Sequence, residues 1–280
     1  MSAAPLPGRE LAADIRAETA ARAAELGAAG RRPRLAVVTA TDDEASAWYA
    51  RSLAAAAGRA GIGCDIHDLG PRAAAADIGA ALAALSGDPG VHGIILQTPL
   101  PGGLRLAGLA AGIDPAKDVD GANPVSLGRL MTGLPGFAPA TAEAVIRLLE
   151  RHGIPLAGRH AVVVGRSAVA GKPVAHLLLD RDATVCICHS RTRDLAAVTT
   201  RADVLVVAAG RAGLIGPEHV APGATVIDVG TNATPDGGLA GDVDPKAAEV
   251  AGALTPVPGG VGPVTTALLL RHVTEAAATM

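Results

Sequence analysis

The 280-residue sequence has few aromatic residues, few lysines and few cysteines. It holds one Trp, one Tyr and one Phe, so its core must be built almost entirely from Ala, Val and Leu. Its only lysines are Lys117, Lys172 and Lys246, and arginine carries nearly all of the positive charge. The net charge of −3 offers no electrostatic basis for binding nucleic acid or an anionic membrane, so neither is expected as a partner.

Long apolar runs and metal-binding patterns are also missing. No stretch reaches the roughly 18 apolar residues of a membrane span, and the N-terminus lacks the apolar segment of a secretory signal. Cys64, Cys186 and Cys188 form no disulfide or metal framework, and the eight histidines have no ligand spacing. We therefore expect a cytoplasmic protein with reduced, buried thiols and no metal site.

The sequence does contain two blocks in which apolar runs alternate with helical patterns. In the first block, a helix over about 43–60 and an Ala-rich helix separate the apolar runs 34–39, 63–69 and 91–97. In the second block, the apolar runs are 160–164, 183–189, 203–209 and 224–230. Such an alternation predicts two α/β domains with parallel sheets, which the Pro- and Gly-rich segment 98–142 would join.

The segment GRSAVAGKP, residues 165–173, follows a predicted strand and opens a predicted helix. At that position of a doubly wound sheet, backbone N–H groups and the helix dipole bind a pyrophosphate. The glycine spacing differs from GxGxxG, because Gly165 and Gly171 are six residues apart. A tight strand-to-helix turn without a ligand, with Pro173 in the first helical turn, is the alternative interpretation.

The end of the next strand indicates which dinucleotide would bind. NAD sites usually place an acidic residue there for the ribose 2′-hydroxyl, whereas this sequence continues His189-Ser190-Arg191-Thr192-Arg193. A hydroxyl and a guanidinium suit a 2′-phosphate instead, so NADP is favoured over NAD. The alternative is a solvated basic turn.

Seven short motifs occur in a fixed order along the chain. They are LQTPLP (96–101), KDVDGANP (117–124), GRSAVAGKP (165–173), CHSRT (188–192), IDVGTN (227–232), GDVD (241–244) and TPVPGGVGPVT (255–265). From about residue 34 to the C-terminus, this series resembles the bacterial methylenetetrahydrofolate dehydrogenase/methenyltetrahydrofolate cyclohydrolase family. PGGVGP and KDVDG are the most specific of the motifs.

The resemblance implies a fold of two α/β domains that flank a cleft, and usually a homodimer. Residues 1–122 with 263–280 would form a folate-binding catalytic domain, and residues 123–262 a Rossmann-like NADP domain. It also implies that 5,10-methylenetetrahydrofolate gives a hydride to NADP⁺ and becomes the methenyl form. In bifunctional members, water then opens the methenyl cation to 10-formyltetrahydrofolate.

The resemblance also assigns roles to individual residues. Asp120 matches the pterin-binding acid, since a carboxylate can accept two N–H bonds from the pterin edge. Gln97 matches the active-site glutamine, and Tyr49 a tyrosine whose ring packs on the folate. On the residues alone, Asp120 could be a turn cap and Gln97 a polar strand end. The remaining assignments are Pro258, Gly259 and Gly260 for folate, and Gly165, Arg166, Ser167, Ser190, Arg191 and Thr231 for NADP.

One position departs from the family in a way that concerns the chemistry. The family pattern S-x-x-Y-x-x-x-K reads Ser46 to Leu53 here, so leucine occupies the place of the family's central catalytic lysine. Leucine neither transfers a proton nor stabilises charge, and Arg51 and Arg59 lie at other helical angles from Tyr49. Loss of an acid/base group typically costs about 10²–10⁴-fold in rate.

This departure favours a dehydrogenase whose cyclohydrolase activity is weak or absent. Hydrolysis needs an activated water, whereas hydride transfer depends more on positioning. The alternatives are a fully bifunctional enzyme, a paralogue retuned for another pterin or reduced substrate, and a catalytically silent NADP- or folate-binding protein. Small residues at Ala122 and at 140–144, where the family often has bulkier ones, leave the pocket shape open.

Overall fold

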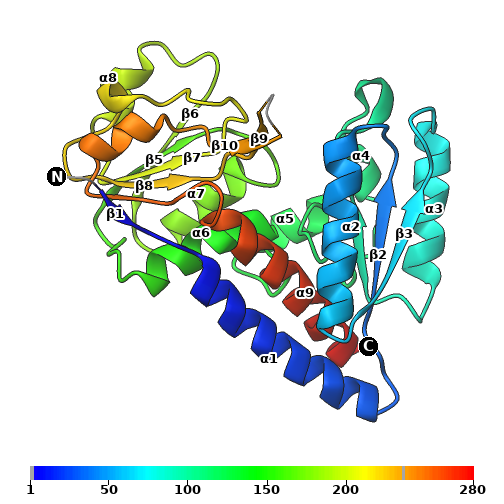
Figure 1. The fold of residues 1–280 in the computed structure, drawn as a ribbon. Helices are drawn as coiled ribbons and strands as arrows, with labels where there is room; N and C mark the ends of the chain where they lie inside the picture. The colour runs from blue at the N-terminus through cyan, green and yellow to red at the C-terminus, as the bar shows by residue number, and fades with distance from the viewer. Residues whose placement is uncertain (1–2, 235–236) are drawn as a thin grey trace. The chain divides into compact units, whose positions relative to one another are not determined.

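The computed structural model describes residues 3–234 and 237–280, which form two compact units (Figure 1). The first unit comprises residues 13–140 and 266–280, and the second comprises the residues up to 12 together with 141–265. The chain passes between them within α1 (Arg9–Ala28), α6 (Ala140–Arg151) and α9 (Val261–Thr279). The sequence predicted domain boundaries after residue 122 and after residue 262. That one domain binds folate and the other NADP stays a prediction.

The first unit is built on a parallel sheet of order β3-β2-β4. Its strands are β2 (Arg34–Thr39), β3 (Gly63–Asp68) and β4 (Gly93–Leu96). Its other elements are α2 (Glu44–Arg59), α3 (Ala75–Gly87), η1 (Pro101–Gly103), α4 (Leu106–Ala110), α5 (Pro124–Met131) and most of α1 and α9. The chain runs from β2 outward to β3 and then returns across β2 to β4, so α2 and α3 cover opposite faces of the sheet (Figure 1).

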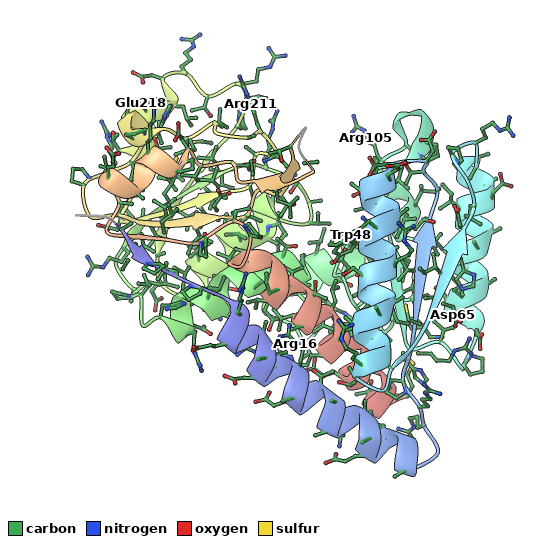
Figure 2. All side chains as sticks on the ribbon, viewed as in Figure 1. Arg16, Trp48, Asp65, Arg105, Arg211 and Glu218 are labelled. Atoms are coloured by element: carbon green, nitrogen blue, oxygen red, sulfur yellow. The ribbon has the colours of Figure 1, made fainter. Side chains whose placement is uncertain are left out.

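Helix α2 begins where Asp43 accepts a hydrogen bond from the Ser46 backbone N–H at 2.7 Å, which caps the helix. Its buried residues recur at helical spacing and form one stripe: Ser46, Ala50, Leu53, Ala56 and Ala57. Trp48 lies off this stripe and is 63% exposed (Figure 2). Tyr49 lies beside the stripe, one turn before Leu53.

The second unit contains a six-stranded sheet of order β1-β11-β8-β7-β5-β6, in which every pairing is parallel. Its strands are β1 (Ala4–Pro5), β5 (His160–Val164), β6 (Thr184–Cys188), β7 (Val204–Val207), β8 (Thr225–Asp228) and β11 (Ala253–Leu254). A separate antiparallel pair is formed by β9 (Asn232–Ala233) and β10 (Leu239–Ala240). The helices are α6, α7 (Gly171–Leu179), α8 (Leu195–Thr199), η2 (Pro217–His219) and η3 (Pro245–Glu249).

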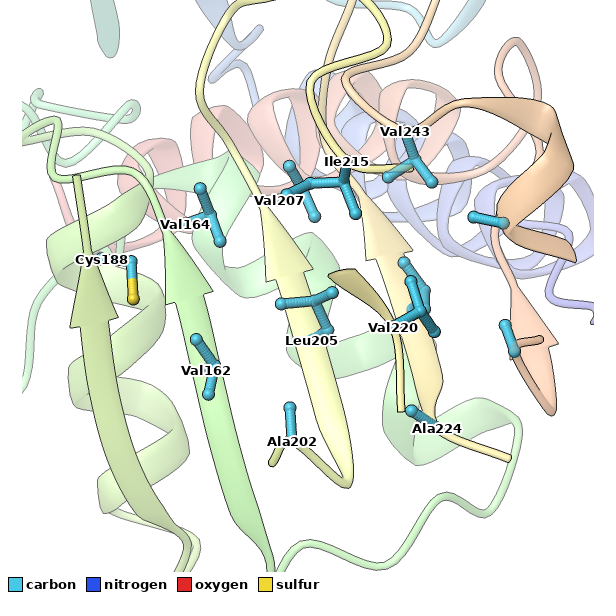
Figure 3. Close-up of a cluster of buried hydrophobic side chains, with 13 residues drawn as sticks. Val162, Val164, Cys188, Ala202, Leu205, Val207, Ile215, Val220, Ala224 and Val243 are labelled. Atoms are coloured by element: carbon cyan, nitrogen blue, oxygen red, sulfur yellow. The ribbon is translucent and has the colours of Figure 1, made fainter. Parts of the chain in front are cut away.

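Small and branched aliphatic side chains fill the core of the second unit (Figure 3). The cluster on one face of the sheet consists of Val162, Val164, Cys188, Ala202, Leu205, Val207, Ile215, Val220, Ala224, Val226, Val243, Ala247 and Ala251. Buried on both faces, β7 and β8 read as the continuous apolar runs expected of central parallel strands.

The predicted parallel sheets and α/β class are confirmed. Each predicted strand is present: β2 and β5 have the predicted bounds, and the others are one to three residues shorter. The segment 98–142 differs from the expectation, because it carries α4 and α5 and lies almost entirely within the first unit. Its Pro and Gly content concealed a helix start, since Asn123 caps α5 and Pro124 occupies the first helical turn. Cys64, Cys186 and Cys188 are free thiols, and of these only Cys188 is buried.

Two buried aspartates accept hydrogen bonds from the loops at the carboxyl ends of β7 and β8. Asp228 accepts the backbone N–H groups of Gly230, Asp242 and Val243 at 2.9–3.0 Å. Asp242 in turn accepts those of Ala209, Gly210 and Arg211 at 2.6–2.9 Å and the Asn232 side-chain amide at 2.9 Å. The IDVGTN and GDVD motifs thus serve to hold three loops together.

Asp242→Asn should lower the free energy of unfolding by about 3 kcal/mol, because the new amide group faces donors and leaves buried N–H groups without an acceptor. The measurement is thermal unfolding of the ligand-free protein. Asp244→Asn is the control, since Asp244 accepts one N–H, from Lys246 at 2.9 Å, at a helix start. Equal stability of the two variants would contradict this role of Asp242.

Candidate active site

Tyr49 on α2 forms a hydrogen bond with the side chain of Thr266 on α9. Burial and, second, the negative charge of Asp120 raise the pKa of Tyr49 to about 12, although the Thr266 hydrogen bond acts to lower it. Tyr49 therefore stays neutral at physiological pH. Its hydroxyl is a hydrogen-bonding group rather than a base.

The KDVDG segment places two aspartates of different character close together. Asp118 is fully buried and accepts the backbone N–H groups of Ala122 at 3.0 Å and Asn123 at 2.8 Å. Burial raises the pKa of Asp118, against these bonds and one to Ser126. The turn is thus capped by Asp118, which leaves Asp120 available for another role.

Asp120 is a half-buried carboxyl group. Burial is the main reason that its pKa rises to about 7, the charge of Asp118 adds to the rise, and His272 acts to lower it. Gly121, the next residue, has φ +62°, and a Cβ there would lie 2.5 Å from the Pro139 nitrogen. Glycine is therefore required beside Asp120 for the segment 137–139 to pack against it.

Several residues around Asp120 gave no signal in the sequence. His272 and Thr266 come from α9, and Phe137 lies just before α6. The Phe137 and His272 rings are 4.9 Å apart, centroid to centroid. Asp118 belongs to a quoted motif, but its capping role became visible only in the structure.

Gln97 directly follows β4, at the carboxyl end of the sheet of the first unit. Its backbone N–H donates to Val38 O at 2.9 Å, and its side-chain Nε2 donates to Thr98 O at 3.0 Å. The same Thr98 carbonyl accepts from Ser46 Oγ at 3.0 Å. The structure thus ties Gln97 to the start of α2, and its catalytic role stays a prediction.

Leu53 is 1% exposed and belongs to the buried stripe of α2. Lys117 is the one lysine of the first unit, and its ammonium group donates to Asp88 O at 2.6 Å. Arg51 and Arg59 are exposed. Neither the arginines of α2 nor Lys117 therefore replaces the cation of the family lysine.

The loop after β5 has the geometry of a nucleotide-phosphate loop. Gly165 has φ +135°, and a Cβ there would collide with the Ala208 carbonyl of the loop that follows β7. The strand order reverses between β5 and β7, which is the switch point where doubly wound sheets bind ligands. Ser167 Oγ accepts the N–H groups of Ala170 at 3.2 Å and Gly171 at 3.4 Å, and Arg166 is exposed.

The other predicted cofactor residues lie on neighbouring loops of the same unit. After β6, His189 N–H donates to Thr192 Oγ1 at 2.8 Å, in a tight turn that leaves Ser190 and Arg191 exposed. Thr231 is exposed on the loop that follows β8. Close backbone approach at Gly165 and a free guanidinium on the next loop fit a dinucleotide with a 2′-phosphate.

The PGGVGP loop also belongs to the second unit. Gly259 and Gly260 are buried, whereas Pro258 is exposed. Gly260 N–H donates to Pro256 O at 2.8 Å, and the Gly259 carbonyl accepts from Gly8 N–H at 2.9 Å. The N-terminal segment thus braces this loop, and its contact with folate stays a prediction.

Membrane-spanning helices and metal clusters are both absent from residues 3–234 and 237–280. No helix there is both long enough and apolar enough to span a membrane. No group of three or more His, Cys, Asp or Glu side chains there could hold a metal ion.

The parallel sheet and its switch-point loop place the second unit in the Rossmann-like class of dinucleotide-binding folds. The family described as "Tetrahydrofolate dehydrogenase/cyclohydrolase, catalytic domain" matches residues 6–120, and its NAD(P)-binding domain matches residues 139–280. The chain belongs to the tetrahydrofolate dehydrogenase/cyclohydrolase family. This confirms the predicted family and the predicted fold class.

Named relatives resemble the chain along nearly its whole length. Bifunctional protein FolD 1 of Rhodococcus jostii is 63% identical over 98% of this chain and 93% of its own. The bifunctional FolD methylenetetrahydrofolate dehydrogenase/cyclohydrolase of Campylobacter jejuni is 37% identical, with a TM-score of 0.94 and 99% coverage of both chains. The Trypanosoma brucei enzyme, solved with NADP cofactor and inhibitor, is 34% identical, with a TM-score of 0.93 and coverage of 100% and 98%.

Asp120→Asn should stabilise the ligand-free protein at neutral and higher pH. The folded-state pKa of Asp120 is raised, so the neutral carboxyl favours folding and its contribution is lost as pH rises toward about 7. An amide is neutral throughout. The gain should grow between about pH 4 and pH 7 and reach about 2 kcal/mol, discounted for partial exposure.

Thermal unfolding of both proteins across this pH range is the measurement. Asp42→Asn, at an exposed position one residue before the α2 cap, is the matched control. A gain that does not depend on pH would contradict the raised pKa of Asp120.

Proposed function

We propose that this protein oxidises 5,10-methylenetetrahydrofolate to the methenyl form with NADP⁺, and that its cyclohydrolase activity is weak or absent. One observation carries the proposal: Tyr49 and Asp120 interact electrostatically in the first unit, while Leu53 is buried one helical turn from Tyr49. The folate-binding groups are thus kept without the family's proton-transfer group. A homodimer, which the family resemblance implies, is part of the proposal.

Each residue has a definite task in this proposal. Asp120 accepts the two N–H groups at the pterin edge, which holds the ring by a charge-assisted pair of hydrogen bonds. Tyr49 packs its ring on the folate and gives its neutral hydroxyl to the polar network with Thr266. NADP⁺ supplies the hydride acceptor, and the loop of Gly165 with Arg191 holds its phosphates.

Hydride transfer is compatible with Leu53, because the reaction requires the folate and the nicotinamide ring to be bound in the correct relative orientation. It moves no proton at this position. Hydrolysis of the methenyl cation requires a water to be activated and a proton to be moved. A buried leucine supplies neither function. The relatives in Rhodococcus jostii and Campylobacter jejuni are named as bifunctional proteins, which favours the bifunctional alternative, so the two activities must be measured separately.

Leu53→Lys should create or raise cyclohydrolase activity by about 100-fold or more, since it restores an ionisable group beside Tyr49. It should also destabilise the protein, because the position is 1% exposed and an ammonium group there is desolvated. Both activities are measured on the natural protein and on this variant.

Leu53→Met is the matched control, since it fills the same apolar space without an ionisable group. It should leave both activities near those of the natural protein. If the natural protein formed no NADPH from methylenetetrahydrofolate and NADP⁺, the dehydrogenase proposal would be wrong. Substantial cyclohydrolase activity with Leu53 in place would instead support the bifunctional alternative.

Arg191→Ala should raise the KM for NADP⁺ by about 10-fold to 100-fold, because a guanidinium that contacts the 2′-phosphate is lost. Activity with NAD⁺, which lacks that phosphate, should change little. Arg193→Ala, two residues further along and also exposed, is the control and should leave both values unchanged. If Arg191→Ala raised the KM for NADP⁺ and for NAD⁺ equally, Arg191 would not contact the 2′-phosphate.

A further inference from the structure

Val119 lies between the two aspartates of the KDVDG segment and is held from α9. Its side chain is fully buried, and its carbonyl oxygen lies 2.8 Å from His272 Nδ1, across 153 residues of sequence. A carbonyl can only accept, so Nδ1 carries the proton of this contact. The backbone immediately before Asp120 is thereby tied to a helix from the far end of the chain.

Packing fixes the orientation of His272. The residue is 2% exposed, and its ring lies against Phe137 at 4.9 Å with an interplanar angle of 33°. The Phe137 carbonyl in turn lies 2.8 Å from where a Cβ on Gly121 would be. Phe137 therefore contacts both His272 and the residue that follows Asp120, and the imidazole donor cannot turn away without disturbing this packing.

The other side of Asp120 is fixed from within its own loop. Asp118 accepts the N–H groups of Ala122 and Asn123 at 3.0 and 2.8 Å. Asp120 thus lies between two anchors, one of them local and the other supplied by His272. Asp118 also acts to raise the pKa of Asp120, whereas His272 acts to lower it.

We propose that His272 is a positioning residue for folate recognition, which holds the Val119 carbonyl and so aims the Asp120 carboxylate at the pterin. This inference rests on the proposed function, because it takes Asp120 as the pterin-binding acid. Two parallel hydrogen bonds from a pterin edge require a carboxylate of fixed orientation. His272 acts through the backbone, so its loss weakens folate binding more than the chemical step.

Two amide substitutions separate this role from general packing. His272→Asn places its N–H₂ group near the position of Nδ1, whereas His272→Gln places it near that of Nε2. His272→Gln should weaken tetrahydrofolate binding about tenfold, and His272→Asn should stay within about threefold of the natural protein. Isothermal titration calorimetry with tetrahydrofolate, without NADP⁺, measures this binding.

Kinetic and exchange measurements complete the test. His272→Gln should raise the KM for the folate with a smaller change in kcat and none in the KM for NADP⁺. Amide hydrogen exchange at Gly121 and Ala122 should be faster in ligand-free His272→Gln but not in His272→Asn. Thr274→Val is the control, since Thr274 is also buried in α9 and its hydroxyl donates to Arg271 O, within the same helix, at 2.8 Å.

The outcomes distinguish this inference from the proposed function. If the natural protein does not bind tetrahydrofolate, the proposed function fails, and the role of His272 fails with it. If it binds and the two amide variants bind equally well or equally badly, only the role of His272 is overturned. Should His272→Gln not fold, His272→Ser replaces it, with the same expected loss of binding and the same outcome against the inference.

Discussion

The first unit depends on how one carboxylate, that of Asp120, is withdrawn from water. Burial is the largest influence on its pKa, and the neighbouring Asp118 works in the same direction. Without a ligand, this carboxyl group is a costly feature of the fold. Donors at a pterin edge would relieve that cost, which links the stability of the unit to the binding of its substrate.

Leu53 contributes to packing as well as to the chemistry of the site. Its side chain completes the apolar stripe by which α2 packs on the sheet, and Tyr49 stands at the edge of that stripe. A lysine there would place a desolvated ammonium group one helical turn from Tyr49, which itself interacts with the Asp120 carboxylate. In the proposed function, Asp120 and Tyr49 still recognise the folate, while leucine at position 53 supplies no group that would move a proton.

Apolar runs predicted the strands correctly, because β2, β5, β7 and β8 are buried on both faces and need continuous aliphatic sequence. The two-residue strands β1 and β11 are too short to show any periodicity. Motif order identified the family, whereas the pterin-binding role that the resemblance gives to Asp120 stays a prediction. No sequence pattern indicates that His272 meets Val119, since that contact exists only after α9 has packed on the KDVDG segment.

The central claim is that oxidation proceeds here without efficient hydrolysis. It is tested most directly by following methylenetetrahydrofolate labelled with ¹³C at the one-carbon unit, by NMR, as the natural protein oxidises it with NADP⁺. We expect the methenyl product to accumulate and 10-formyltetrahydrofolate to appear only at the uncatalysed rate. Formyl product that rises in step with NADPH, without methenyl accumulation, would contradict it.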